Sequence, residues 1–98
     1  MSSYLLSTEA KKDFLSIRAY TLKRWGALQA QKYLDSLEKK CDDLVKRPHL
    51  GRERPEIKTG FRSISEGKHM IFYRVSKKGI EILRVLHTRV DIEYKLQD

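Results

Sequence analysis

Hydrophobic residues recur at helical spacing in two consecutive segments of the N-terminal half. A short apolar run at residues 3–6 precedes the first segment and predicts a strand. The apolar positions of the first segment lie three or four residues apart: Ala10, Phe14, Ile17 and Tyr20 or Thr21. Either Ser7 or Thr8 can cap the N-terminus of a helix here, and Gly26 interrupts the pattern. A first helix is therefore predicted over residues 8–25.

The second segment carries the most regular apolar stripe in the chain. Alternating steps of four and three residues place five side chains on one helix face: Ala30, Leu34, Leu37, Cys41 and Leu44. Lys46 and Arg47 suit the negative end of the helix dipole, and Pro48 cannot continue the helix. Because the break between the two helices is short, we expect them to fold back on one another as a hairpin.

The second half of the chain changes to the pattern of β-strands. Residues 48–60 are rich in Pro, Gly and charge, which predicts a loop between the helical half and the strand half. Three strands are then predicted, at residues 61–65, 68–75 and 80–87, and the short turns between them make an antiparallel meander. The predicted fold class is α+β, with the helical hairpin packed against a small antiparallel sheet.

The register of the last two strands predicts how the sheet faces are used. If the two strands on either side of the turn at residues 77–79 pair without interruption, Tyr73 lies opposite Ile82 and Ile71 lies opposite Arg84. One face then carries Ile71, Tyr73, Val75, Ile80, Ile82, Arg84 and Leu86; the other carries Met70, Phe72, Leu83 and Val85, beside a charged pair of Arg74 and Glu81. We expect the helices to pack on the second set. Loops, the C-terminal tail, a partner protein or a second copy would then have to cover the first face.

Composition narrows the class of protein without choosing a function. The chain has 98 residues, 40% of them hydrophobic and 35% charged, with a formal net charge of +8. We predict a single domain over residues 1–98, with a flexible tail at residues 92–98. The charge favours an acidic partner, either a nucleic acid or a protein surface. Cys41 is the lone cysteine, no apolar run could span a bilayer, and the N-terminus lacks the pattern of a secretory signal, so we expect a cytoplasmic protein.

The residue types that carry chemistry are sparse. His49, His69, His87 and Cys41 fall in different predicted elements without paired ligand spacing, so we expect no metal site and no cofactor. Arg62, Arg74 and Arg84 lie on adjacent predicted strands, and arginines so placed can clamp a phosphodiester. With His87 or Tyr94 to move a proton, such a set would describe a metal-free ribonuclease. Alternatively, Arg74 pairs with Glu81 and the other arginines bind a carboxylate-rich partner.

Several motifs resemble those of ParE toxins, in the RelE/ParE superfamily. Residues 25–33 (Trp-Gly-Ala-Leu-Gln-Ala-Gln-Lys-Tyr) resemble the Trp-Gly-x-x-Gln-Ala-x-x-Tyr junction between the two helices of that family. Residues 48–51 (Pro-His-Leu-Gly) resemble its Pro-x-x-Gly loop. Residues 60–62, 69–74 and 84–91 resemble its three strand motifs, and the order holds from Tyr4 to Asp91.

The resemblance implies an RelE-like fold, with a helical hairpin on a curved antiparallel sheet, and membership of a type II toxin–antitoxin system. ParE toxins act on DNA gyrase and are neutralised by a ParD antitoxin, whose C-terminal segment wraps over the toxin. RelE relatives instead cut messenger RNA on the ribosome. The helix junction and the Arg-Val-Leu-His-x-Arg ending favour the ParE branch. We therefore expect a non-catalytic gyrase inhibitor that forms a hetero-oligomer with its antitoxin and has no sequence-specific binding of nucleic acid.

The site residues follow from the predicted uncovered face and from this resemblance. We expect the antitoxin to contact Ile71, Tyr73, Ile80, Ile82, Arg84 and Leu86. Arg84 and Arg89 are the predicted contacts to the target, because a half-buried arginine is costly without an anionic partner. Trp25 is expected to anchor the hairpin, and Gly26 to permit its turn. The alternatives are an RelE-type ribonuclease using Arg62, Arg84 and His87, and a toxin-fold protein that only binds its antitoxin.

Overall fold

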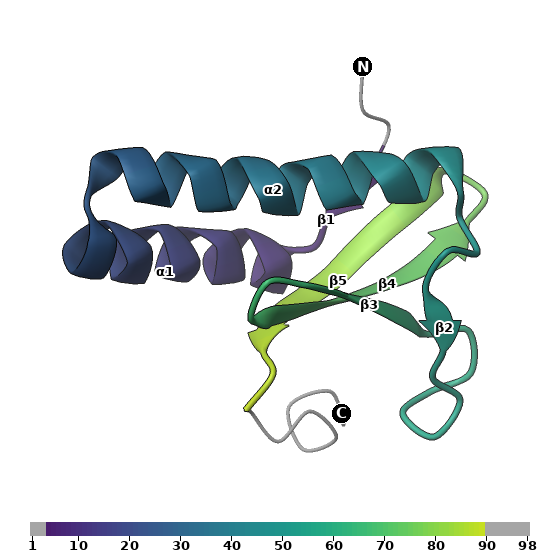
Figure 1. Ribbon diagram of the computed structural model, residues 1–98. Coiled ribbons are helices and arrows are strands. Elements are labelled where there is room, and N and C mark those ends of the chain that lie inside the picture. The colour runs from purple at the N-terminus through teal and green to yellow at the C-terminus, as the bar shows by residue number, and fades with distance from the viewer. Residues whose placement is uncertain (1–3, 90–98) are drawn as a thin grey trace.

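Both predicted helices are present in the computed structural model, which describes residues 4–89 (Figure 1). Helix α1 spans Thr8–Trp25 and α2 spans Ala27–Lys46. Ser7 caps α1, since its Oγ accepts a hydrogen bond from the backbone N–H of Ala10 at 3.0 Å. Gly26 joins the helices with φ 91° and ψ 169°, a conformation that residues with a Cβ rarely adopt. The predicted helix boundaries and the role of Gly26 are confirmed.

Five strands form one mixed sheet in the order β1-β5-β4-β3-β2. The predicted meander is confirmed as β3 (Arg62–Glu66), β4 (His69–Ser76) and β5 (Gly79–His87). The predicted N-terminal strand is β1 (Tyr4–Leu6), and it pairs with β5 in parallel. The two residues of β2 (Arg52–Glu53) lie inside the predicted loop and pair with β3, so that part of the loop prediction is wrong. The α+β class is confirmed.

A β-bulge in β5 changes the register that the sequence predicted. Tyr73 pairs with Ile82 as expected, but the next residue of β4, Phe72, pairs with Arg84, so Leu83 is the extra residue. Ile71 consequently pairs with Val85, and the predicted pairing of Ile71 with Arg84 is wrong. Because side chains alternate between faces, the extra residue moves every later residue of β5 to the opposite face.

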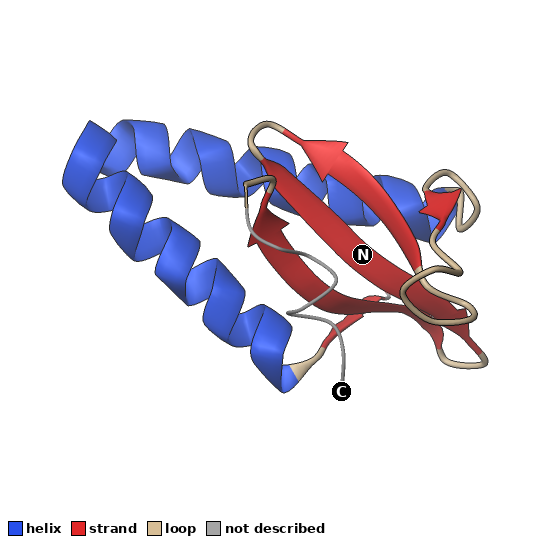
Figure 2. Ribbon diagram, turned by 90° about the horizontal axis from the view of Figure 1, so that it is seen from below, coloured by secondary structure: helices blue, strands red, loops and turns tan. Residues whose placement is uncertain are grey.

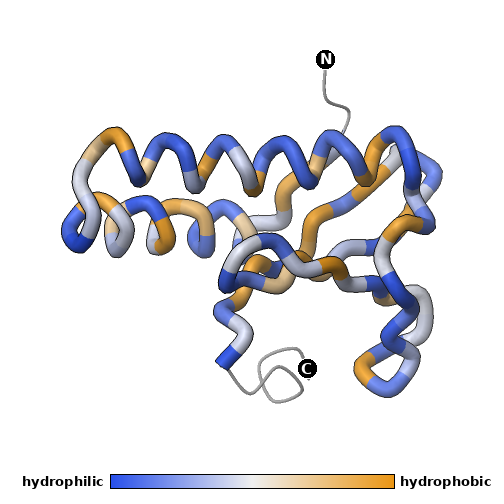
Figure 3. Tube along the Cα trace, in the orientation of Figure 1, coloured by the Kyte–Doolittle hydropathy of each residue, from blue (hydrophilic) through white to orange (hydrophobic). Residues whose placement is uncertain are grey.

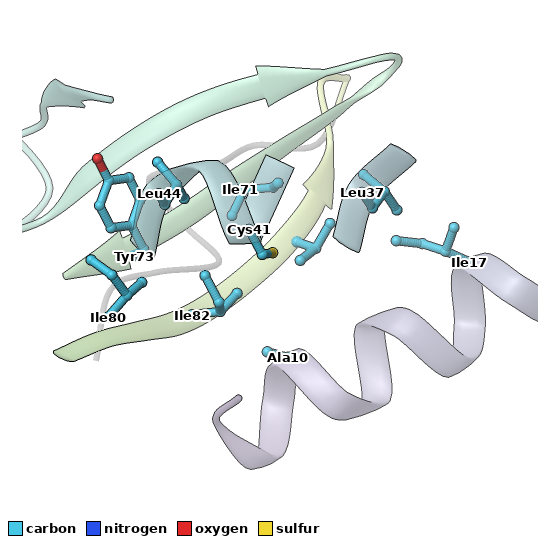
Figure 4. Packing of buried hydrophobic residues seen from close by; sticks show 10 residues of the cluster. Ala10, Ile17, Leu37, Cys41, Leu44, Ile71, Tyr73, Ile80 and Ile82 are labelled. Atoms are coloured by element: carbon cyan, nitrogen blue, oxygen red, sulfur yellow. The ribbon is translucent and has the colours of Figure 1, made fainter. Parts of the chain in front are cut away.

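The helices pack on the face that was predicted to be uncovered. The core contains Ile71, Tyr73, Ile80, Ile82 and Val85 of the sheet, with Ala10, Ile17, Leu37, Cys41 and Leu44 of the helices (Figure 4). The predicted assignment of faces is therefore wrong, and the bulge explains why Val85 joins this set. The α2 stripe is confirmed, and its apolar positions recur along the helix (Figure 3). On α1 the fourth position is Thr21, which is buried, and not Tyr20, which is 63% exposed.

Figure 2 shows the opposite face of the sheet from below. The strand register places Phe72 and Leu86 on this face, and they are 0% and 6% exposed. The Arg54 guanidinium lies over the Phe72 ring, 5.6 Å from its centroid. Arg54 donates hydrogen bonds to Ser63 Oγ at 3.0 Å and Glu56 Oε2 at 2.6 Å, which hold it in place. A loop residue therefore covers part of this face. The predicted tail at residues 92–98 and Tyr94 lie outside the described residues.

Replacing Leu37 with Ala tests the packing of α2. Leu37 is 0% exposed, and removing a fully buried leucine side chain should lower the free energy of unfolding by about 2–5 kcal/mol. Leu28→Ala is the matched control on the same helix, because Leu28 is 72% exposed. Urea denaturation should shift the midpoint strongly for the first variant and hardly for the second. Equal midpoints would contradict the assignment of the core.

Candidate functional site

The sheet residues that were predicted to bind the antitoxin are buried inside the fold. Ile71, Tyr73 and Ile82 are 0% exposed and Ile80 is 2% exposed. The Tyr73 hydroxyl donates to the Pro48 carbonyl and accepts from the Gly51 N–H, both at 2.8 Å, and burial raises the pKa of Tyr73. These residues do not form the uncovered apolar surface on which the prediction relied. Leu86 lies on the other face and is also buried.

Arg84 has its anionic partner within the chain. Its Nε donates to Asp13 Oδ2 at 2.8 Å and its Nη2 donates to Asp13 Oδ1 at 3.0 Å. The Asp13 carboxylate, on α1, also accepts the backbone N–H of Val85 at 2.9 Å. The hydrogen bond to Asp13 is the main reason that the pKa of Arg84 is raised. The half-buried guanidinium of Arg84 therefore has an anionic partner, as expected, and that partner lies on α1.

The three residues of the alternative ribonuclease set do not converge. The Arg62 Nη1 donates to the Gly51 carbonyl at 2.7 Å, in the loop after α2, while Arg84 binds α1. Arg62 pairs with Tyr73 of β4, whereas His87 pairs with His69, four residues away along that strand. That separation is roughly 13 Å along an extended chain. No shared phosphate position is formed by these side chains.

His87 instead belongs to an aromatic cluster that docks α2 on the β3–β4 turn. The His69 and His87 rings lie 5.4 Å apart, and the Tyr33 hydroxyl is 2.5 Å from His69 Nδ1. The same hydroxyl accepts the Lys68 N–H at 3.1 Å. Burial, and then the charge of His87, lower the pKa of His69. A Cβ at Gly67 would lie 2.6 Å from the Tyr33 ring, so this contact depends on glycine.

Arg89, the second predicted target contact, has an exposed side chain. Its backbone N–H donates to His87 Nδ1 at 3.1 Å. No group of three or more His, Cys, Asp or Glu side chains within residues 4–89 could hold a metal ion. Neither α1 nor α2, the helices that the structure describes, is long and apolar enough to cross a membrane.

An apolar groove runs between the two helices where β1 enters the sheet. Its volume is about 160 Å³. Seven residues line it, and we call it the α1–α2 groove: Tyr4, Leu6, Phe14, Leu15, Arg18, Leu34 and Glu38. Leu15 is 67% exposed, so a large apolar side chain faces solvent at its rim. The groove has the chemistry to receive an apolar helix face, with one cation and one anion beside it.

In the sequence, the signal for the groove rim is an apolar residue of α1 that lies outside the core stripe. Leu15 and Leu22 are apolar residues outside the core stripe of α1, and they lie seven residues apart. That spacing places both on one side of the helix. Only Ala10, Ile17 and Thr21 of α1 are buried. Both side chains are exposed, and Leu15 lines the groove whereas Leu22 does not.

Comparison with known proteins gives a consistent set of matches. Residues 4–92 match the family described as "ParE toxin of type II toxin-antitoxin system, parDE". Toxin ParE1 of Mycobacterium tuberculosis is 42% identical over 96 residues, which are 97% of this chain and 98% of that toxin. Toxin ParE1 of Caulobacter vibrioides is 37% identical over 87 residues, 89% of this chain and 90% of that toxin.

A solved structure also shares the fold. The structure titled "Chromosomal ParDE TA system from P. aeruginosa" aligns with a TM-score of 0.74 and 24% sequence identity. The alignment covers 89% of this chain and 96% of that one. The arrangement of two helices on a mixed sheet is therefore not particular to this chain.

Replacing Asp13 with Asn tests the internal pairing of Arg84. The amide keeps an acceptor for the Val85 N–H but leaves a partly buried guanidinium without its anion, which should cost about 1–3 kcal/mol of stability. Glu81→Gln is the control, because it removes the carboxylate of a pair in which the Arg74 side chain is 52% exposed. That change should cost about 0–1 kcal/mol. Equal urea midpoints for the two variants would contradict a structural role for Asp13.

Proposed function

The chain belongs to the family of ParE toxins of type II toxin–antitoxin systems, and from that premise we propose that it inhibits DNA gyrase and is neutralised by a cognate ParD-type antitoxin. The resemblance predicted from the sequence motifs is thereby confirmed. The proposed mode of action is binding to other proteins. The observation that supports it most directly is the apolar α1–α2 groove, a surface suited to a protein partner.

The arrangement of the cations supports binding over RNA cleavage. Arg84 binds Asp13, Arg62 binds the Gly51 carbonyl, and His87 lies in the aromatic cluster with His69. Metal-free cleavage of RNA needs cations and an acid–base group around one phosphate. These three residues do not supply that arrangement, so ribonuclease activity is the weaker candidate.

We propose the α1–α2 groove as the antitoxin site, in place of the sheet face. An amphipathic helix would place its apolar side chains against Phe14, Leu15 and Leu34, the usual way in which a helix is recognised by a groove. The formal net charge of +8 would speed the encounter with an acidic antitoxin segment. Arg18 and Glu38 beside the groove would orient the bound helix through complementary charges.

Purified protein in two assays tests the proposed target. We expect inhibition of DNA supercoiling by gyrase and no translation-dependent cleavage of messenger RNA. Adding the cognate antitoxin should restore supercoiling. Cleaved messenger RNA with unaffected gyrase would favour the ribonuclease alternative, and inactivity in both assays with tight antitoxin binding would identify a protein that only binds its antitoxin.

Replacing Leu15 with Glu tests the proposed antitoxin site. The charge would be buried against an apolar helix face on binding, so the affinity for the antitoxin should fall at least about tenfold. Tyr20→Glu is the matched control, because Tyr20 is 63% exposed on the same helix and does not line the groove. Titration calorimetry should separate the two variants. Unchanged affinity for Leu15→Glu would rule out the groove.

A further inference from the structure

The connection between α1 and α2 displays large apolar side chains to solvent. Every residue from Leu22 to Gln29 is exposed, and within this stretch Leu22 is 46%, Trp25 63% and Leu28 72% exposed. This end of the hairpin projects beyond the sheet (Figure 1). The expectation that Trp25 anchors the hairpin is therefore wrong. We call Leu22, Arg24, Trp25 and Leu28 the hairpin tip.

The hairpin tip is a formed surface, since its residues sit on two regular helices. The Gly26 N–H donates to the Leu22 carbonyl and the Ala30 N–H donates to the Gly26 carbonyl, both at 3.0 Å. The Arg24 guanidinium lies 5.7 Å from the centroid of the Trp25 indole ring, within the range of a cation–π contact. An exposed tryptophan beside an arginine has the composition of a protein-binding hot spot.

Charge limits what can bind there. Residues 14–34 include four cations, Arg18, Lys23, Arg24 and Lys32, and no acidic residue. Two copies meeting tip to tip would bring these like charges together, which disfavours a second copy. A nucleic acid could neutralise the cations, but its phosphates would leave Leu22 and Leu28 without an apolar contact. An acidic protein surface with an apolar recess would neutralise the cations and would also contact the exposed leucines.

We propose that the hairpin tip docks on the target of the toxin, at an acidic protein surface with a recess for the Trp25 indole. This inference rests on the proposed function, because it assigns the target contact of that same toxin. The tip and the α1–α2 groove share α1, where Leu15 and Leu22 are two turns or roughly 10 Å apart. An antitoxin helix in the groove would lie close enough to obstruct a target at the tip.

The test compares Trp25→Ala and the double variant Trp25→Ala/Leu28→Ala with the unaltered protein. The concentration for half-maximal inhibition of gyrase supercoiling should rise at least about tenfold, as for loss of a hot-spot tryptophan. Growth arrest on expression in bacteria should be lost in parallel, and this readout does not depend on the identity of the target. Antitoxin affinity and the urea midpoint should stay near those of the unaltered protein.

Val75→Ala is the matched control, since Val75 is an apolar side chain that is 45% exposed on a strand at a distance from the hairpin. Arg24→Glu should also weaken inhibition, and its inhibition should depend less on salt than that of the unaltered protein. Both effects follow if Arg24 faces an acidic partner.

The outcomes separate this inference from the proposed function. If the unaltered protein arrests growth without inhibiting gyrase, and the tip variants lose the arrest, the gyrase proposal fails and the tip proposal stands. Tip variants that keep both activities would overturn the tip proposal. Loss of antitoxin binding in the tip variants would assign the tip to the antitoxin instead, and a Trp25-dependent mobility shift of duplex DNA would assign it to nucleic acid. A chain that neither inhibits gyrase nor arrests growth would overturn both proposals.

Discussion

The extra residue that Leu83 adds to β5 is the constraint on which the rest of the structure depends. It moves Val85 onto the face of Ile80 and Ile82, so one side of β5 stays apolar along its length. The start of α1 is hydrogen-bonded to the bulge residue, because the Ser7 hydroxyl donates to the Leu83 carbonyl at 2.7 Å. The same hydroxyl oxygen caps the helix by accepting from the Ala10 N–H. Asp13, nearly two turns further along α1, adds a second contact by accepting a hydrogen bond from the Val85 N–H.

These contacts explain why the two proposed binding surfaces lie on the helices. With α1 held against β5 and α2 packed over the sheet through Leu37 and Leu44, the apolar sheet residues are used in the core. The outer side of α1 then remains free, and its apolar residues form the groove rim and part of the tip. A helix that buries few residues in the core can present the others to partners, at some cost in its own stability.

The charges divide in a similar way between internal and external roles. Arg54, Arg62 and Arg84 each have partners within the chain and stabilise loops or the α1 contact. The cations of residues 14–34 face solvent on a segment without any carboxylate. The high net charge thus does not describe one uniform basic surface. It is the sum of arginines that stabilise the fold and exposed cations that can contact an acidic partner.

Much of this structure could be predicted from the sequence because it depends on local interactions. The stripe from Ala30 to Leu44, a helix cap at Ser7 or Thr8, the Gly26 turn and the order of the meander depend on neighbouring residues. The motifs of the helix junction, the Pro-x-x-Gly loop and the strands together indicated the family. The covered face of the sheet was decided by tertiary structure alone. Both faces are apolar, periodicity does not say which one the helices choose, and the bulge at Leu83 breaks the alternation without a local signal. The parallel pairing of β1, the partner of Arg84 and the exposure of Trp25 likewise depend on contacts between residues far apart in the chain.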